Sequence, residues 1–366
     1  MKNITMQEAL GMTLNEANNL VSDLFQHRAE VYWTDFLCCL LLGYGSFLLV
    51  DPTHLFSISN ILLSMVSIVF IYRMSMFTHE ISHFRQGQMT SFATTWNLMC
   101  GIPLLIPKFM YKNHKEHHAK KSFATENDGE YIDFSNRSPL EIVGYLLLQF
   151  IAPLAFVVRF LILAPLSWFF PAVREITWQR FSSLSIDPDY RRPLPKSRST
   201  QYSFEEAGCF LLIILVLFGL NSGAIAVERI YQWYIVISAM LFMNGLRVLA
   251  AHKYNLDALT DKTVEDIAKQ STEGNYALQF LDSINHSSSE ILGPVWAPIG
   301  LRYHAIHHLF PAMPYHGLAE AHQRLKVCTP KQALWHDLCE AKSLFSTLRT
   351  LLRVAKEKNN NKEQLA

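Results

Sequence analysis

The chain has 366 residues, of which 50% are apolar and 17% are charged, and its formal net charge is +1. A mean hydropathy of +0.12 is too high for an ordinary soluble enzyme of this length, and the scattered Lys and Arg residues exclude a basic nucleic-acid surface. The composition predicts an integral membrane protein, and because its six cysteines form no C-x-x-C pair, neither a zinc ribbon nor a disulfide framework is expected.

The chain begins with a charged segment, residues 1–30, that lacks the basic start, apolar middle and cleavage site of a signal peptide. We expect it to form a helical segment outside the membrane, followed by a membrane domain over 31–326. Stretches of about 20 apolar residues can cross a bilayer, and four are present: 31–50, 58–78, 207–227 and 233–251. Two interrupted apolar regions cover 92–110 and 142–170. Residues 327–366 are expected to form a C-terminal surface helix and a polar tail.

Three short clusters contain more than half of the histidines, and their spacing predicts a metal site. They are HEISH with His79 and His83, HKEHH with His114, His117 and His118, and HAIHH with His304, His307 and His308. Residues three and four apart share one face of a helix, so each cluster would present its imidazoles in one direction. A single ion rarely takes more than about six ligands. We therefore expect a dinuclear centre with a position left open.

The clusters can meet only if an even number of membrane crossings separates them. HEISH ends the second span and HAIHH follows the fourth, so 92–110 and 142–170 are expected to lie along the interface or to dip in and return. The loop 51–57 has no Lys or Arg, whereas the opposite side of the membrane would be rich in both. Positive residues mark the cytosolic side, so a multi-pass protein with a cytosolic metal site is predicted.

The order and spacing of the clusters, H-x3-H, H-x2-H-H and H-x2-H-H between apolar spans, resemble those of the membrane fatty-acid desaturases and the closely related hydroxylases. The sequence that follows the third cluster, His307–Leu318, is also similar to that family. The resemblance covers about residues 31–326. It implies an all-α integral membrane fold with four transmembrane helices in two hairpins and a cytosolic helical cap. In that cap the eight histidines of the clusters would ligate two iron ions.

The resemblance also implies a ninth ligand just after the fourth span, where this chain has His252. Some acyl-CoA members carry Asn four residues earlier, which reaches one metal through water, but Val248 stands here. Asn244 and His286 are the alternatives for that role. Ligating histidines usually have their second ring nitrogen hydrogen-bonded, and the candidates for this role are Glu80, Glu116, Asp282 and Asn285.

Ligand type alone would allow Fe, Zn, Cu or Ni in such a site. Iron is favoured because the site lies at the end of an apolar bundle, where lipids gather, and oxidation of their unactivated C–H bonds needs a redox metal and O₂. We expect an O₂-dependent di-iron desaturase that introduces a C=C bond into a fatty-acyl chain, with hydroxylation as the main alternative. No catalytic residue beyond the metal centre is expected.

No haem, dinucleotide or iron–sulfur signature occurs in the sequence. Electrons are therefore expected from an external donor such as ferredoxin, rubredoxin or cytochrome b5.

Two unrelated functions also fit parts of the pattern. HEISH matches the H-E-x-x-H motif of zinc proteases, with Glu80 as the base, but one zinc with three ligands leaves two clusters unexplained. A metal transporter or sensor would place its ligands near mid-membrane, whereas the centres of the four spans contain no His, Asp or Glu.

Overall fold

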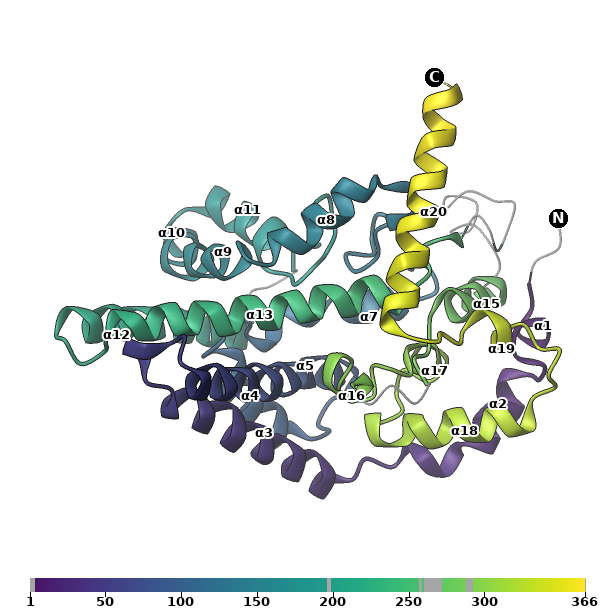
Figure 1. The fold of residues 1–366 in the computed structure, drawn as a ribbon, viewed down its shortest axis with the longest axis horizontal. Coiled ribbons are helices and arrows are strands. Elements are labelled where there is room, and N and C mark those ends of the chain that lie inside the picture. Colours follow the sequence, from purple (N-terminus) through teal and green to yellow (C-terminus); the bar gives the residue numbers. More distant parts are fainter. Residues whose placement is uncertain (1–3, 196–198, 257–258, 260–271, 288–291, 366) are drawn as a thin grey trace. The chain divides into compact units, whose positions relative to one another are not determined.

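The computed structural model of the chain describes residues 4–195, 199–256, 259, 272–287 and 292–365. Over these ranges the chain folds into helices and loops, and its extended pairings are isolated β-bridges (Figure 1). This confirms the expected all-α fold. The chain divides into two compact units: unit 1 consists of Met1–Arg28, Lys115–Tyr145 and Gly245–Ala366, and unit 2 of Ala29–His114 and Leu146–Asn244.

Unit 2 contains most of the apolar helices. Its helices are α3 (Ala29–Leu49), α4 (Ile58–Ser75), α5 (Phe77–His83), α6 (Thr90–Trp96), α9 (Ala152–Val158), α10 (Ala164–Phe169), α11 (Pro171–Phe181) and α12 (Thr200–Asn221). It also has 3-10 turns η2 (Pro52–His54) and η4 (Lys108–Tyr111), and π turns η3 (Asn97–Gly101) and η6 (Arg159–Leu163). Three helices run across the division between the units: α7 (His114–His118), α8 (Pro139–Leu148) and α13 (Val227–Ala251).

The four expected spans are largely helical, although the helix bounds differ from the apolar stretches. The third differs most, because α12 ends at Asn221 and residues 222–226 form the turn before α13. The second span and HEISH form one apolar helical stretch, Ile58–His83, and α12 and α13 begin at Thr200 and Val227, several residues before the stretches read from sequence. Backbone hydrogen bonds continue a helix into the polar interface, whereas an apolar window covers only its hydrocarbon-spanning part.

A fifth helix is long and apolar enough to cross a membrane. In Ala152–Phe169, α9, the π turn η6 and α10 continue as 18 residues of helix, about 27 Å at the usual rise. Among the described residues no such helix lies in 92–110. Five apolar helices support an integral membrane protein, while the arrangement of four spans in two hairpins stays a prediction.

Helices α3 and α4 pack side by side as a hairpin (Figure 1). Gly43 permits the close approach, because a Cβ there would lie 3.0 Å from the Ile71 side chain. The Ser67 hydroxyl donates to the Gly43 carbonyl at 3.0 Å, and Arg73 forms a bidentate pair with Asp35 at 2.5 and 2.7 Å. Large apolar side chains such as Leu48 point outward, as expected of a surface that faces lipid.

Unit 1 surrounds a core of buried apolar residues contributed by both ends of the chain. Its helices are α1 (Met6–Leu10), α2 (Leu14–Leu20), α15 (Thr272–Asp282), α16 (Gly293–Trp296), α17 (His304–Leu309), α18 (Leu318–Cys328), α19 (Trp335–Leu338) and α20 (Leu344–Leu365), with 3-10 turns η1 (Ser22–Phe25), η5 (Phe134–Asn136) and η8 (Tyr315–Gly317). Leu10 of α1, Phe280 of α15, Ile306 of α17 and Trp335 of α19 share this core. The N-terminal helices are therefore integral to the unit that carries the third histidine cluster.

The two N-terminal helices begin with the same local signal. Thr5 and Thr13 cap α1 and α2, and Glu8 and Glu16, three residues later, complete a capping box in each case. The reciprocal bonds satisfy N–H groups that an isolated helix start would leave unpaired. These caps explain why a polar segment of this length forms two short helices.

Candidate metal centre

Each histidine cluster is helical, as its spacing predicts. HEISH lies in α5, HKEHH forms α7, and HAIHH opens α17. The helical periodicity places residues three and four apart on one face, so histidines of one cluster can approach the same point.

Four histidines of unit 1 converge on one point. His117, His252, His304 and His308, here called the tetrad, are all buried, and one nitrogen from each lies within 4.8 Å of the others. The Nε2 atom of His252 is 3.2 Å from that of His117 and 3.0 Å from that of His304. The Nε2 atoms of His304 and His308 are 3.1 Å apart. Three segments distant in the sequence thus supply one nitrogen-rich site.

Two buried carboxylates lie beside the Nδ1 atoms of two tetrad histidines. Asp128 lies 2.9 Å from Nδ1 of His117, and Asp282 lies 3.2 Å from Nδ1 of His252. Tyr131 donates its hydroxyl to Asp282 at 3.1 Å. A carboxylate beside Nδ1 stabilises the proton on that nitrogen and leaves the Nε2 lone pair directed inward.

The facing lone pairs fit a bound cation. When His117 and His252 are both neutral and their Nδ1 protons face Asp128 and Asp282, neither ring has a proton to place between Nε2 atoms that are 3.2 Å apart. A metal ion between them would replace this repulsion with coordination. The buried Nδ1 of His304 has no hydrogen-bond partner among the described residues, which leaves Nε2 as the atom that faces the other rings.

The protonation equilibria of the tetrad favour neutral rings at two positions. Burial lowers the pKa of His304 well below its usual value. Burial also lowers the pKa of His252, although the hydrogen bond that His252 donates to Asp282 acts in the opposite direction. Burial opposes protonation of His117 too, but the charge of Asp128 outweighs it and raises the pKa of His117. Neutral imidazole is the form that ligates a metal.

The other predicted ligands form two further groups, each within its own unit. In unit 1, the Nε2 atoms of His118 and His307 are 3.0 Å apart. In unit 2, His79, His83 and His114 form a triad with ring centroids 4.5 to 5.2 Å apart.

Tyr111 stacks on His114, with centroids 4.8 Å apart. Glu80 is buried beside the triad and accepts a 2.5 Å hydrogen bond from Tyr32. Its second oxygen lies 3.9 Å from Nδ1 of His79. The glutamate of HEISH is thus engaged by a tyrosine of α3.

The remaining candidates have different surroundings. His286 is buried, but its Nε2 lies 3.0 Å from the Ala250 carbonyl, and it is not one of the tetrad. Asn285 accepts hydrogen bonds from the backbone of Ala305 and Ile306, at 3.0 and 3.3 Å, at the start of α17. Glu116 is only half-buried. Asn285 therefore contacts the third cluster through its helix backbone.

Asp128 is the residue that sequence reasoning missed. It lies eleven positions after His117, and its own oxygens accept from the backbone N–H groups of Ala124 and Glu130, both at 3.0 Å. No helical or strand spacing connects it to a histidine cluster. The Asn127-Asp128-Gly129 sequence is a turn signal and was the one available hint that the chain reverses there.

Comparisons with known proteins identify relatives of the chain. The sequence model of the fatty acid desaturase family matches residues 52–338. A ceramide hydroxylase of Caulobacter vibrioides (strain NA1000 / CB15N) is 34% identical over 347 residues, which cover 94% of each chain. No solved structure matches. The resemblance in the histidine clusters is confirmed, and the chain belongs to the fatty acid desaturase family.

Proposed function

We propose that the protein is an O₂-dependent membrane hydroxylase that acts on a ceramide-type lipid. The observation that carries this proposal is the similarity to a ceramide hydroxylase across 94% of both chains. Hydroxylation was the alternative in the sequence analysis, and this relative favours it over desaturation. Desaturation of a fatty-acyl chain is the second candidate, supported by the name of the matching family.

The proposed cofactor is a pair of iron ions held by the nine predicted histidines. Within unit 1, the tetrad would hold one of the two ions. When bound, the ions would supply the redox chemistry that lets O₂ oxidise an unactivated C–H bond. An imidazole-only donor set of this kind accepts iron.

Residues that contact the tetrad would keep its histidines oriented and shielded from water. Asp128 and Asp282 hold protons on Nδ1 of their histidines, so that the inward nitrogens stay basic. Phe123 and Tyr131 lie against the tetrad, with centroids 5.5 Å from His117 and 5.6 Å from His252 respectively. These rings exclude water from the metal-facing nitrogens, which limits loss of oxidising equivalents to solvent.

Two partners follow from this chemistry. The reaction consumes electrons, and we propose a separate donor of the ferredoxin, rubredoxin or cytochrome b5 type at the cytosolic side. The substrate reaches the site from the membrane, because ceramide-type lipids partition into the bilayer.

Product mass in a host that makes ceramide tests the proposal. We expect cells that express the chain with an electron donor to accumulate ceramide with one additional oxygen. His304→Ala should abolish this product and lower bound iron, because it removes a buried member of the tetrad. His54→Ala, at an exposed histidine in the loop between α3 and α4, is the matched control. Loss of two hydrogens instead would establish the desaturase, and unchanged product from His304→Ala would contradict the site.

A further inference from the structure

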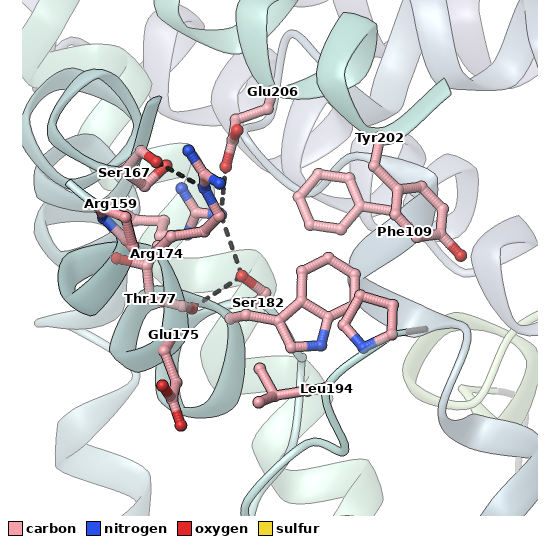
Figure 2. Close-up of a pocket in the computed structure, with 13 residues that line it drawn as sticks. Phe109, Arg159, Ser167, Arg174, Glu175, Thr177, Ser182, Leu194, Tyr202 and Glu206 are labelled. Carbon is pink, nitrogen blue, oxygen red and sulfur yellow. Dashed lines mark hydrogen bonds and ion pairs between the residues drawn. The ribbon is translucent and has the colours of Figure 1, made fainter. Parts of the chain in front are cut away.

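Unit 2 contains a cavity of about 310 Å³ that the metal centre does not use (Figure 2). It is lined by residues from η4, η6, α10, α11, α12 and the chain that follows α11. All the lining residues belong to unit 2. The cavity combines buried charged and hydroxyl groups with an aromatic wall.

On the expected topology, in which α12 crosses the membrane, the cavity lies at the level of lipid headgroups. Tyr202 and Glu206 line it from the first two turns of this 22-residue helix. A helix of this length crosses the hydrocarbon core, so its end turns lie near the interface.

Apolar side chains near the cavity are exposed. Leu194 lines the cavity and is 50% exposed, while Phe169 and Ile176 on α10 and α11 are 76% and 53% exposed. An apolar rim beside a polar cavity suits an amphipathic ligand that arrives from the bilayer.

The charges of the cavity balance. Arg159 and Glu206 are buried and form an ion pair at 2.7 Å, and Arg159 also donates to the Ser182 hydroxyl at 3.0 Å (Figure 2). Arg174 and Glu175, one of each sign, are exposed lining residues. With no excess of positive charge, the cavity is poorly suited to a phosphate and better suited to a neutral polar group.

One buried hydroxyl in the cavity wall lacks a hydrogen-bond partner among the described residues. It belongs to Thr177, which is 2% exposed. A buried hydroxyl without a partner lowers stability, and a ligand that supplies a donor or acceptor removes this cost.

Aromatic residues make up the apolar part of the cavity wall. Trp178 and Tyr202 stack with centroids 5.5 Å apart, and Phe109 lies 5.7 Å from Tyr202. Cations lie over two of these rings, Arg192 over Trp178 and Lys112 over Tyr202, each 4.4 Å from the ring centroid. The rings still give the wall an apolar part for the first methylenes of a lipid chain.

We propose that this cavity binds the polar headgroup of a neutral lipid that carries hydroxyl and amide groups, as a ceramide does. The inference rests on the proposed function for the identity of the lipid. Phe109 belongs to η4, and η4 packs against α5, the helix of His79 and His83. A headgroup held here would be separated from the unit 2 triad by η4, which suits a substrate-positioning site.

Direct binding tests the proposal without turnover. The purified full-length protein in lipid nanodiscs is titrated with a fluorescent short-chain ceramide, with diacylglycerol, which lacks the amide, and with phosphatidic acid. We expect ceramide to bind best. Thr177→Val keeps the shape but removes the hydroxyl, and should weaken ceramide binding about 3- to 10-fold, whereas Thr177→Ser should restore it. Leu194→Trp should obstruct the cavity. The matched control is Ile176→Trp, at a similarly exposed residue of α11 that does not line the cavity.

Binding and turnover separate the two proposals. If Thr177→Val weakens ceramide binding but no oxygenated ceramide is formed by the unmodified chain, the cavity assignment stands and the proposed function fails. If the chain hydroxylates ceramide while Thr177→Val and Leu194→Trp bind it normally, the cavity assignment is wrong. Equal binding of phosphatidic acid would overturn the neutral class of ligand. In the active enzyme, Thr177→Val should raise KM with kcat nearly unchanged.

Discussion

At the scale of single residues, the carboxylates beside the tetrad determine which imidazole nitrogen faces inward. Asp128 is buried, and burial alone would raise its pKa, but His117 and two backbone N–H groups lower it below the usual value. Asp128 therefore stays ionised and can hold the proton of Nδ1. Asp282 lies 3.2 Å from Nδ1 of His252 and also accepts a hydrogen bond from the Tyr131 hydroxyl.

Replacing the Asp128 carboxylate with an amide of the same shape removes its charge and so tests the role of that charge. We expect Asp128→Asn to weaken metal binding about 10- to 100-fold, because an amide stabilises the Nδ1 proton of His117 less well. Competition against a chelator, read by metal analysis of the purified protein, measures this. The control is Asp133→Asn. Asp133 lies in the same segment between α7 and α8 but accepts hydrogen bonds from Ser135 and Asn136, so this variant should retain normal affinity for the metal. Equal affinities of the two variants would contradict the role of Asp128.

A second residue-scale prediction concerns acid stability. Glu340 is largely buried, which raises its pKa, but hydrogen bonds from His322, Ser287 and Asn285 outweigh burial and lower it. A lowered pKa in the folded state stabilises the fold above the unfolded pKa, and this stabilisation is lost as pH falls below about 4.3. Glu340→Gln should therefore unfold at a lower temperature than the parent chain at neutral pH. The difference should shrink between about pH 5 and 3 in melting curves in detergent, and a difference that grows with acid would refute the assignment.

At the scale of elements, the third histidine cluster depends on a residue outside its helix. Helix α17 has six residues, too few to be stable alone. Asn285 accepts from two of its backbone N–H groups and donates to Glu340 at 2.9 Å, so it ties α17 to the chain after α19. Three histidines of the proposed centre therefore rely on one buried amide.

Removing that amide should loosen the cluster. Asn285→Ala leaves the N–H groups of Ala305 and Ile306 buried without their acceptor, at a cost of about 1–3 kcal/mol. We expect a lower melting temperature together with lower iron content, checked by thermal unfolding and metal analysis of the same sample. Asn136→Ala, which removes an amide bonded to Asp133 far from the cluster, is the comparison. Full iron content in Asn285→Ala would show that α17 positions its histidines without Asn285.

The histidine clusters were readable because a helix converts linear spacing into a shared face, and so the helical form of all three was predictable. Membrane spans were readable for a similar reason, since hydrocarbon thickness sets a minimum apolar length. The contact of Asp128 with His117 and the Asn285–Glu340 hydrogen bond could not be predicted from the sequence in this way. They depend on turns and on contacts between residues 55 positions apart, which no local periodicity encodes. The continuous helix over Ala152–Phe169 is hard to predict from the sequence, because its prolines and Arg159 interrupt the apolar pattern. Pro153 stands in the first turn of the helix, where its missing N–H costs little. Pro165 follows the π turn η6, in which the Ala164 N–H bonds to the Arg159 carbonyl five residues earlier, so the regular α-helical hydrogen-bond pattern is already interrupted there.

At the scale of the whole molecule, the number of membrane crossings decides whether the histidine clusters can face one side. We expect Ala152–Phe169 not to cross, so that residues before and after it lie on the cytosolic side. Single cysteines at Glu126 and Arg180, in a chain without its native cysteines, should both react with an impermeant thiol reagent only from the cytosolic side. Phe56→Cys, in the α3–α4 loop, should react only from the other side. Labelling of Glu126→Cys and Arg180→Cys from opposite sides would overturn the four-span topology.

The assembly of unit 1 from three separated segments has a consequence for biosynthesis. Helices α1 and α2 are translated before the other helices of unit 1, yet the core that receives them includes α17, α18 and α19. The apolar side chains of α1 and α2 therefore stay unshielded until α17, α18 and α19 have been translated. Maturation of the metal site is therefore a late event, and deletion of the first two helices would disturb it although they contain no ligand.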